Sequence, residues 1–245
     1  MSDTGSGTMV LARFLARAGI GSRRSCEALI RTGAITINGR VVSEPAVRVD
    51  PYRDRVSCHG RVLSILASRY YLLNKPRGYV CSSRDRHASK LAIDLLDIPR
   101  NERVYSIGRL DKDSEGLLLF TNDGDMAQTL MHPRFGITKT YRVYVDGPLA
   151  RSDMKVLEAG IIDDSEVLKA VSGRVIRSGR KSAVVKIVVA EGKKREIRRM
   201  AAQLNRRVTR LLRIAFGPIK LGTLESGSWR PLTDAEVRRL QSISF

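Results

Sequence analysis

The amino-acid sequence predicts an α+β fold in which a small N-terminal module precedes a larger domain built mainly on an antiparallel sheet. Three observations support this prediction. Helical and strand patterns both occur, they follow each other without a regular βαβ rhythm, and the chain changes character near residue 65. With 245 residues, 42% of them hydrophobic, the chain can build two unequal domains with sizeable cores.

The first part of the chain reads as two short helices followed by a hairpin. The segment LARFLARAG, which starts at Leu11, has apolar residues along one helical face and ends at Gly19. Ser22 is the predicted N-cap of a second helix, RRSCEALIRTG. The next segment, AITINGRVV, alternates around Asn38-Gly39, a pair that accepts positive φ and favours a tight hairpin. The first eight residues, MSDTGSGT, are expected to form a flexible tail.

The remaining chain mixes strands and helices. Strands are predicted for RYYLLNK, GLLLFT, KTYRVYVDG and SAVVKIVVAEG, the first of them broken at Lys75-Pro76 and the second followed by a turn at NDG. Short helices are predicted for DMAQTLMHP, stopped by Pro133, and for REIRRMAAQLNRRV, in which Ile197 and Met200 begin an apolar stripe. These elements complete the α+β assignment.

The charge of the chain indicates a nucleic-acid partner. There are 44 Lys and Arg against 25 Asp and Glu, a formal net charge of +19, and a basic surface binds phosphate chains through counterion release. The excess is concentrated between residues 191 and 213, where nine basic residues face two glutamates. Residues 151–170 hold five acids against three bases and are expected to face away from RNA.

Several other classes of protein are disfavoured. The dispersed Cys and His residues lack metal-ligand spacing, so no zinc site is expected; they are Cys26, Cys58, Cys81, His59, His87 and His132. Free thiols without a signal peptide favour the cytoplasm. No apolar run approaches the ~20 residues of a membrane span. No GxGxxG or Walker pattern occurs, so no nucleotide cofactor is expected.

Three features are candidates for chemistry. Asp111 lies in GRLDKDSEGLLLFTNDGD, just ahead of a buried strand, although many such residues are simple turn aspartates. The second feature is the basic segment from Glu191 to Arg213, which favours RNA over an ordinary solvated face. The third is Tyr141 in KTYRVYV, whose alternation with valines also fits an aromatic residue of the sheet core.

The N-terminal part resembles a known RNA-binding module. Two short helices, arginines at the start of the second, and the strand-turn ITINGRVV are similar over residues 9–65 to the module named after ribosomal protein S4. The resemblance implies that the helix pair and hairpin grip folded RNA largely by its backbone. It makes Arg13, Arg23 and Arg24 candidates for phosphate contacts.

The larger part resembles the pseudouridine synthases that modify ribosomal RNA, in the branch with an S4-type module. The resemblance rests on LLNKPRGYVCS, YSIGRLDKDSEGLLLFTNDGDMA, KTYRVYV and EGKKREIRRM, which occur in the order of that family. It implies a tail at residues 1–8, an S4-type domain at 9–68 and a catalytic domain at 69–245.

The family's residue roles carry over as expectations. Asp111 matches the essential aspartate, and Tyr141 matches the tyrosine that stacks on the target base and takes part in proton transfer at C5. Arg198 matches the basic residue that pairs with the aspartate, with Arg195 and Arg199 as alternatives. Arg109 matches an arginine that fills the gap left by the flipped nucleotide. Lys75, Arg195 and Arg199 complete the predicted RNA-binding set.

The implied reaction is an isomerisation, which needs no metal, phosphate donor or redox cofactor. The N1–C1′ bond of uridine breaks and the uracil is rejoined through C5. A carboxylate can add to C1′ as a nucleophile, or remove the C2′ proton to give a glycal-like intermediate, and the sequence does not separate these routes. Either route is expected to use an ionised Asp111 in a dry pocket, kept charged by a nearby arginine.

The expected substrate is a loop or bulge uridine of ribosomal RNA, free or in a pre-ribosomal particle, because such a base is extruded at low cost. The motif forms favour large-subunit RNA over small-subunit RNA, and a monomer is expected. A non-catalytic ribosome-assembly factor would explain the charge but not the three site residues. A glycosidase would require a second carboxylate with an assigned role, which the sequence does not offer.

Overall fold

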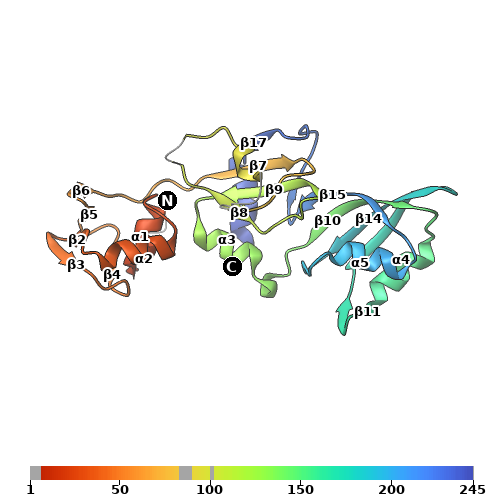
Figure 1. The fold of residues 1–245 in the computed structure, drawn as a ribbon, viewed down its shortest axis with the longest axis horizontal. Coiled ribbons are helices and arrows are strands. Elements are labelled where there is room, and N and C mark those ends of the chain that lie inside the picture. The colour runs from red at the N-terminus through yellow and green to blue at the C-terminus, as the bar shows by residue number, and fades with distance from the viewer. Residues whose placement is uncertain (1–6, 83–89, 100–101, 245) are drawn as a thin grey trace. The chain divides into compact units, whose positions relative to one another are not determined.

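The computed structural model describes residues 7–82, 90–99 and 102–244, and these form two compact units (Figure 1). The first unit is drawn from residues 7–69, 98–99, 102–104 and 122–124, and the second from residues 70–82, 90–97, 105–121 and 125–244. Most of the predicted N-terminal tail and His87 lie outside the described residues.

The first unit packs two helices against short strands. Its elements are β1 (Met9–Val10), α1 (Leu11–Arg17), α2 (Arg23–Arg31), β2 (Ile35–Ile37), β3 (Arg40–Val42), β4 (Arg48–Val49), β5 (Val56–Cys58) and β6 (Arg61–Val62). Strands β3-β2-β5-β6 form one sheet, and β1 pairs with β4. The apolar face of α1 is buried with Ile30 and Ile35, as the helical spacing predicts. Ser22 caps α2 by accepting a hydrogen bond from Ser25 N at 3.2 Å, which confirms the predicted cap.

The second unit is built on one large sheet. Its elements are β7 (Tyr70–Lys75), η1 (Ala92–Leu95), β8 (Tyr105–Ile107), β9 (Glu115–Thr121), α3 (Gly124–Met131), η2 (Pro133–Phe135), β10 (Lys139–Asp146), α4 (Arg151–Ala159), β11 (Ile161–Asp163), β12 (Glu166–Leu168), β13 (Ser172–Ser178), β14 (Ser182–Val189), α5 (Glu196–Gln203), β15 (Val208–Phe216), β16 (Ile219–Lys220), β17 (Trp229–Pro231), α6 (Asp234–Gln241) and η3 (Ser242–Ser244). The predicted α+β class is confirmed.

The order of strands in this sheet is β13-β14-β10-β15-β9-β7-β17, with β16 added beside β15 and β8 beside β9. Neighbouring strands are antiparallel except β15 and β9, which are parallel. At that junction Gly116 takes a φ of +104°, and a Cβ there would lie 2.3 Å from Arg213 O. Glycine therefore permits the close approach of β9 to β15.

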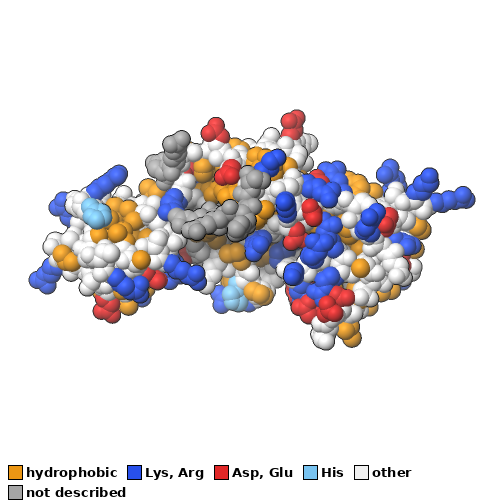
Figure 2. Space-filling model, in the orientation of Figure 1, with side chains coloured by type: hydrophobic (Ala, Val, Ile, Leu, Met, Phe, Trp, Pro, Cys, Tyr) orange, Lys and Arg blue, Asp and Glu red, His pale blue; other side chains and the backbone are white. Residues whose placement is uncertain are grey.

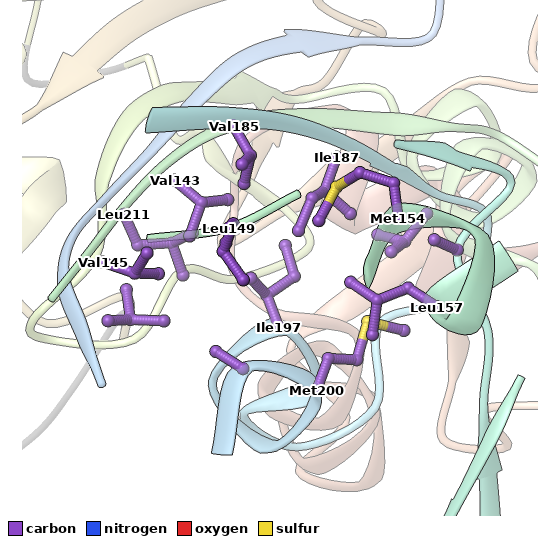
Figure 3. Packing of buried hydrophobic residues seen from close by; sticks show 14 of the residues in the cluster. Val143, Val145, Leu149, Met154, Leu157, Val185, Ile187, Ile197, Met200 and Leu211 are labelled. Atoms are coloured by element: carbon purple, nitrogen blue, oxygen red, sulfur yellow. The ribbon is translucent and has the colours of Figure 1, made fainter. Parts of the chain in front are cut away.

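Two apolar cores support the sheet. In one, α4 and α5 pack on β10, β14 and β15, and Val143, Ile187, Ile197 and Met200 interdigitate there (Figure 3). In the other, α3 and α6 pack on β7, β8 and β9. Because α5 is anchored by this core, the residues at its N-terminal end are held in a fixed position beside the sheet.

One predicted helix is too long. The sequence predicts helix through residues 195–208, whereas α5 ends at Gln203. Asn205 takes a left-handed φ of 55°, and Arg206 N donates back to Ala201 O at 2.9 Å, which closes the helix. The basic residues after this point therefore lie on a loop and on β15. Within the described residues, no helix is long and apolar enough to cross a membrane.

Candidate active site

Asp111 lies in the loop that joins β8 to β9. Leu110 before it and Ser114 after it are buried, whereas residues 111–113 are exposed at the rim. Ser114 N donates to Asp111 O at 3.0 Å, and Gly78 N donates to Lys112 O at 2.8 Å, so the loop is fixed by its backbone. The prediction that Asp111 is shielded from water does not hold in this structure, because its side chain stands at an open cavity mouth.

A cavity of about 480 Å³ brings the predicted residues together. Asp111, Arg109, Tyr141 and Arg195 all line it, although they come from three separate segments of the chain. Tyr141 lies on β10, is half-buried, and packs one side against the core below α5. The alternative that Tyr141 is only a core aromatic is therefore incomplete, since the same residue faces the cavity that holds the aspartate.

Two arginines at the start of α5 are candidates to balance the charge of Asp111. Arg195 lines the cavity, whereas Arg198 is not among its lining residues. Arg195 is exposed, adopts a left-handed φ of 53°, and precedes the first residue of α5. Arg198 donates to Asp113 O and Val208 O, each at 3.2 Å, and its buried Nε has no partner among the described residues. Burial and the charge of Arg195 lower the pKa of Arg198, whereas Asp113 and Asp111 raise it. Arg198 thus lies within electrostatic reach of Asp111, but the described residues contain no direct ion pair between them.

Arg199 lies in a different environment. It forms ion pairs with Asp163 and Glu166, and its Nη2 donates to Asp163 O at 2.8 Å. These bonds tie α5 to the β11–β12 hairpin, where acidic side chains gather among the basic ones in Figure 2. Of the three arginines considered as partners of Asp111, Arg199 is therefore the one whose charge is already paired with other carboxylates.

Lys75, predicted to contact RNA, is completely buried at the end of β7. Its ammonium group donates to Ser114 O at 2.7 Å and to Pro76 O at 3.0 Å. Burial lowers the pKa of Lys75, and nearby acids, Glu115 and Asp111 among them, raise it. The structure thus places this cation beneath the loop of Asp111, where it supports the loop and presents no charge to solvent.

The other predicted RNA contacts occupy two settings. In the first unit, Arg23 and Arg24 are exposed in the first turn of α2, and Arg13 is half-buried on α1. In the second unit, Arg109 is exposed and contributes to the cavity wall beside Asp111.

The sequence analysis missed a second carboxylate in the cavity. Glu196, the first residue of α5, lines the cavity with Asp111 and is only 5% exposed. Burial and the charge of Glu191 raise its pKa to about 7, against the opposing effects of Lys193 and Lys139. Its position in the EGKKREIRRM segment, on the helical face of buried Ile197 and Met200, is the signal that could have identified it.

The arrangement is suited to nucleophilic or basic chemistry by the carboxylate of Asp111. Asp111 shares the cavity with Lys and Arg side chains, and the phenol of Tyr141 lines the same cavity, where it can stack on a base or transfer a proton. Among the described residues, no three His, Cys, Asp or Glu side chains come together as a metal site. The volume lies within the range of about 300–1,000 Å³ for small-ligand sites, so the cavity can admit one nucleoside.

Comparison with known proteins adds independent information. Residues 69–203 match the family model described as RNA pseudouridylate synthase, and residues 11–51 match the S4 domain model. The chain is 38% identical to an uncharacterized RNA pseudouridine synthase of Aquifex aeolicus, over 93% of this chain and 92% of that one. It is 35% identical to the ribosomal large subunit pseudouridine synthase B of Bacillus subtilis, over 96% of each chain. A crystal structure of a pseudouridylate synthase superposes with a TM-score of 0.65 at 29% identity, covering 95% of this chain and 99% of that one.

Proposed function

The chain belongs to the RNA pseudouridylate synthase family, and on that premise we propose that it converts one uridine of large-subunit ribosomal RNA to pseudouridine. The observation that carries the proposal is the single cavity shared by Asp111, Tyr141 and Arg195. The large-subunit target is supported by a relative that is named for that subunit and that this chain matches along nearly its whole length. Small-subunit RNA is the alternative target.

In the proposed mechanism Asp111 is the catalytic carboxylate. The target uridine leaves its stack, at a cost of a few kcal/mol, and enters the cavity. Arg109, at the rim, occupies the gap that the nucleotide leaves. As the N1–C1′ bond breaks, its electron pair leaves with the uracil, and Asp111 adds to C1′ or removes the C2′ proton. Tyr141 stacks on the uracil while it turns. C5 then bonds to C1′ as the Asp111–C1′ bond breaks or the proton returns to C2′, and the uracil loses its C5 proton and gains one at N1.

The guanidinium of Arg198 balances the charge of Asp111. Its unpartnered Nε and its electrostatic link to Asp111 support this role over one for Arg199, whose charges are already paired. Arg195 lines the cavity, is exposed to solvent, and suits a phosphate of the bound strand. Because the site is open, we infer that RNA itself excludes water when it binds.

The remaining parts of the proposal concern RNA recognition. Residues 9–68 grip folded RNA by its backbone through Arg13, Arg23 and Arg24, and residues 69–245 carry out the reaction. The substrate is a loop or bulge uridine, free or in a pre-ribosomal particle, and the protein acts as a cytoplasmic monomer.

Replacing Asp111 by Asn tests the function. Pseudouridine is mapped in ribosomal RNA from a strain that lacks this protein and is complemented with wild-type or variant genes. The wild type should restore one large-subunit site. Asp111→Asn should lower the rate of pseudouridine formation at least ~10³-fold and should keep the affinity for RNA. Asp164→Asn is the matched control, because this exposed residue has a φ of 48° that Asn also adopts.

Each outcome has a defined meaning. Full activity of Asp111→Asn would refute the catalytic assignment and favour a binding-only assembly factor. A large-subunit map that does not change in the deletion strain would refute the target, and a lost small-subunit site would establish the alternative.

A further inference from the structure

A second, larger cavity lies beside the first in the second unit. It has a volume of about 1030 Å³ and shares Arg109, Tyr141, Gly192 and Lys193 with the smaller one. Four Lys and Arg residues line it, against the single carboxylate of Glu191. The large cavity is therefore a cationic extension of the proposed nucleoside site, and it is larger than one nucleoside requires.

Two of these cations stand next to Tyr141 on the sheet. Lys139 is two residues before Tyr141 on β10, so both side chains leave the same face. In the register with β15, Tyr141 lies opposite Arg213 and Lys139 lies opposite Phe216. The Lys139 Nζ and the Arg213 guanidinium carbon are 5.9 Å and 5.6 Å from the centre of the Phe216 ring. Both cations thus flank one aromatic ring beside the stacking tyrosine.

Arg213 is buried with an incomplete set of hydrogen bonds. It is only 3% exposed, and its Nε donates to Leu117 O at 2.7 Å. Its buried Nη2 has no partner in the part of the chain that the structure describes. Burying a guanidinium group with an unused N–H donor costs free energy unless another group accepts a hydrogen bond from that donor.

Lys139 is half-buried close to Arg213, and among the described residues it forms no ion pair with a carboxylate. Its ammonium group donates to Ala190 O at 2.9 Å. Burial and the charge of Arg213 lower the pKa of Lys139, and Glu196 and Glu191 raise it. Neither acid is a full counter-charge. Glu191 is paired with Lys193 at 2.7 Å, and the pKa of about 7 leaves Glu196 partly protonated at neutral pH.

We propose that Lys139 and Arg213 form a binding site for a phosphodiester of the RNA strand next to the nucleotide stacked on Tyr141. The inference rests on the proposed function, since it identifies which part of the substrate the larger cavity holds. A phosphate supplies an anion that the described residues do not pair with either cation, and guanidinium and ammonium groups bind it through charge-assisted hydrogen bonds. The surrounding apolar wall, Phe216 included, strengthens these contacts by lowering the local dielectric.

The dinucleotide UpU and its neutral methylphosphonate analogue test the site directly. They have nearly the same shape and differ in the charge of the bridging group. Binding to the full-length protein is followed by NMR through the Arg213 Nε–Hε signal, assigned by its loss in Arg213→Lys. UpU should shift this signal saturably, and the analogue should bind about tenfold more weakly, the scale of one charge-assisted hydrogen bond.

Variants of Lys139 locate the contact. Lys139→Met should weaken UpU about tenfold and leave the binding of the analogue unchanged. Lys139→Arg should retain UpU binding, which separates loss of charge from loss of fold. Lys155→Met, on an exposed position of α4 outside both cavities, is the matched control and should alter neither ligand.

Three results would overturn the proposal: equal binding of UpU and its analogue, no effect of Lys139→Met, or an Arg213 signal that does not respond to UpU. Tighter binding of inorganic phosphate than of UpU would also overturn it, because the site would then accept a free anion. These binding measurements do not depend on turnover. If deletion of the protein does not change the pseudouridine map of ribosomal RNA, the proposed function is refuted, but the result of the UpU binding measurements still stands.

Discussion

Glu196 should make the protein less stable as the pH rises through neutrality. It is 5% exposed, and burial followed by the charge of Glu191 raises its pKa from 4.5 to about 7. The folded protein therefore binds this proton more tightly than the unfolded chain does. The resulting contribution of Glu196 to the free energy of unfolding is about 3 kcal/mol. It is fully present below pH 4.5 and is lost as the pH rises through about 7.

Glu196→Gln keeps the size of the side chain and removes its titration. In urea unfolding between pH 4.5 and 8.5, the free energy of unfolding of the wild type should fall by about 3 kcal/mol more than that of the variant. Glu225→Gln, at an exposed position, is the control and should follow the wild-type curve. Parallel curves for the wild type and Glu196→Gln would show that burial does not hold the proton on this carboxyl group.

Two further substitutions test the fold around the site. Gly116→Ala should lower the free energy of unfolding in urea by about 3 kcal/mol or more, because the φ of Gly116 is +104° and the new Cβ would lie 2.3 Å from Arg213 O. Gly179→Ala is the control and should be nearly neutral, because its Cβ would lie 3.8 Å from the nearest atom. Glu236→Gln should cost about 1 kcal/mol at pH 7, because its paired partner Arg230 lowers the pKa of Glu236 to about 2. That contribution is present above pH 4.5 and is lost as the pH falls through about 2, so a cost that persists at pH 2 would contradict it.

Local features of the fold were predictable because their causes lie within a few residues of chain. The Ser22 cap depends on a backbone N–H three residues away, and the hairpin depends on the positive φ of Asn38 and its neighbouring glycine. The environment of Lys75 was not predictable, since its ammonium group bonds to Ser114 O, 39 positions along the chain. Periodicity carries no information about such a contact. The same limit applies to Arg199, whose acidic partners lie on another hairpin.

The exposure of Asp111 changes how its carboxylate is thought to be kept reactive. A buried aspartate would need a permanent ion pair, and a substrate would have to break that pair before reaching the carboxylate. In this structure Asp111 instead shares its cavity with four Lys and Arg residues and with Glu196. Within the described residues, no side chain forms an ion pair with the Asp111 carboxylate, so its oxygens are open to a substrate. Desolvation would then come from the entering nucleotide, so that the dry environment exists only when a uridine is in place to use it.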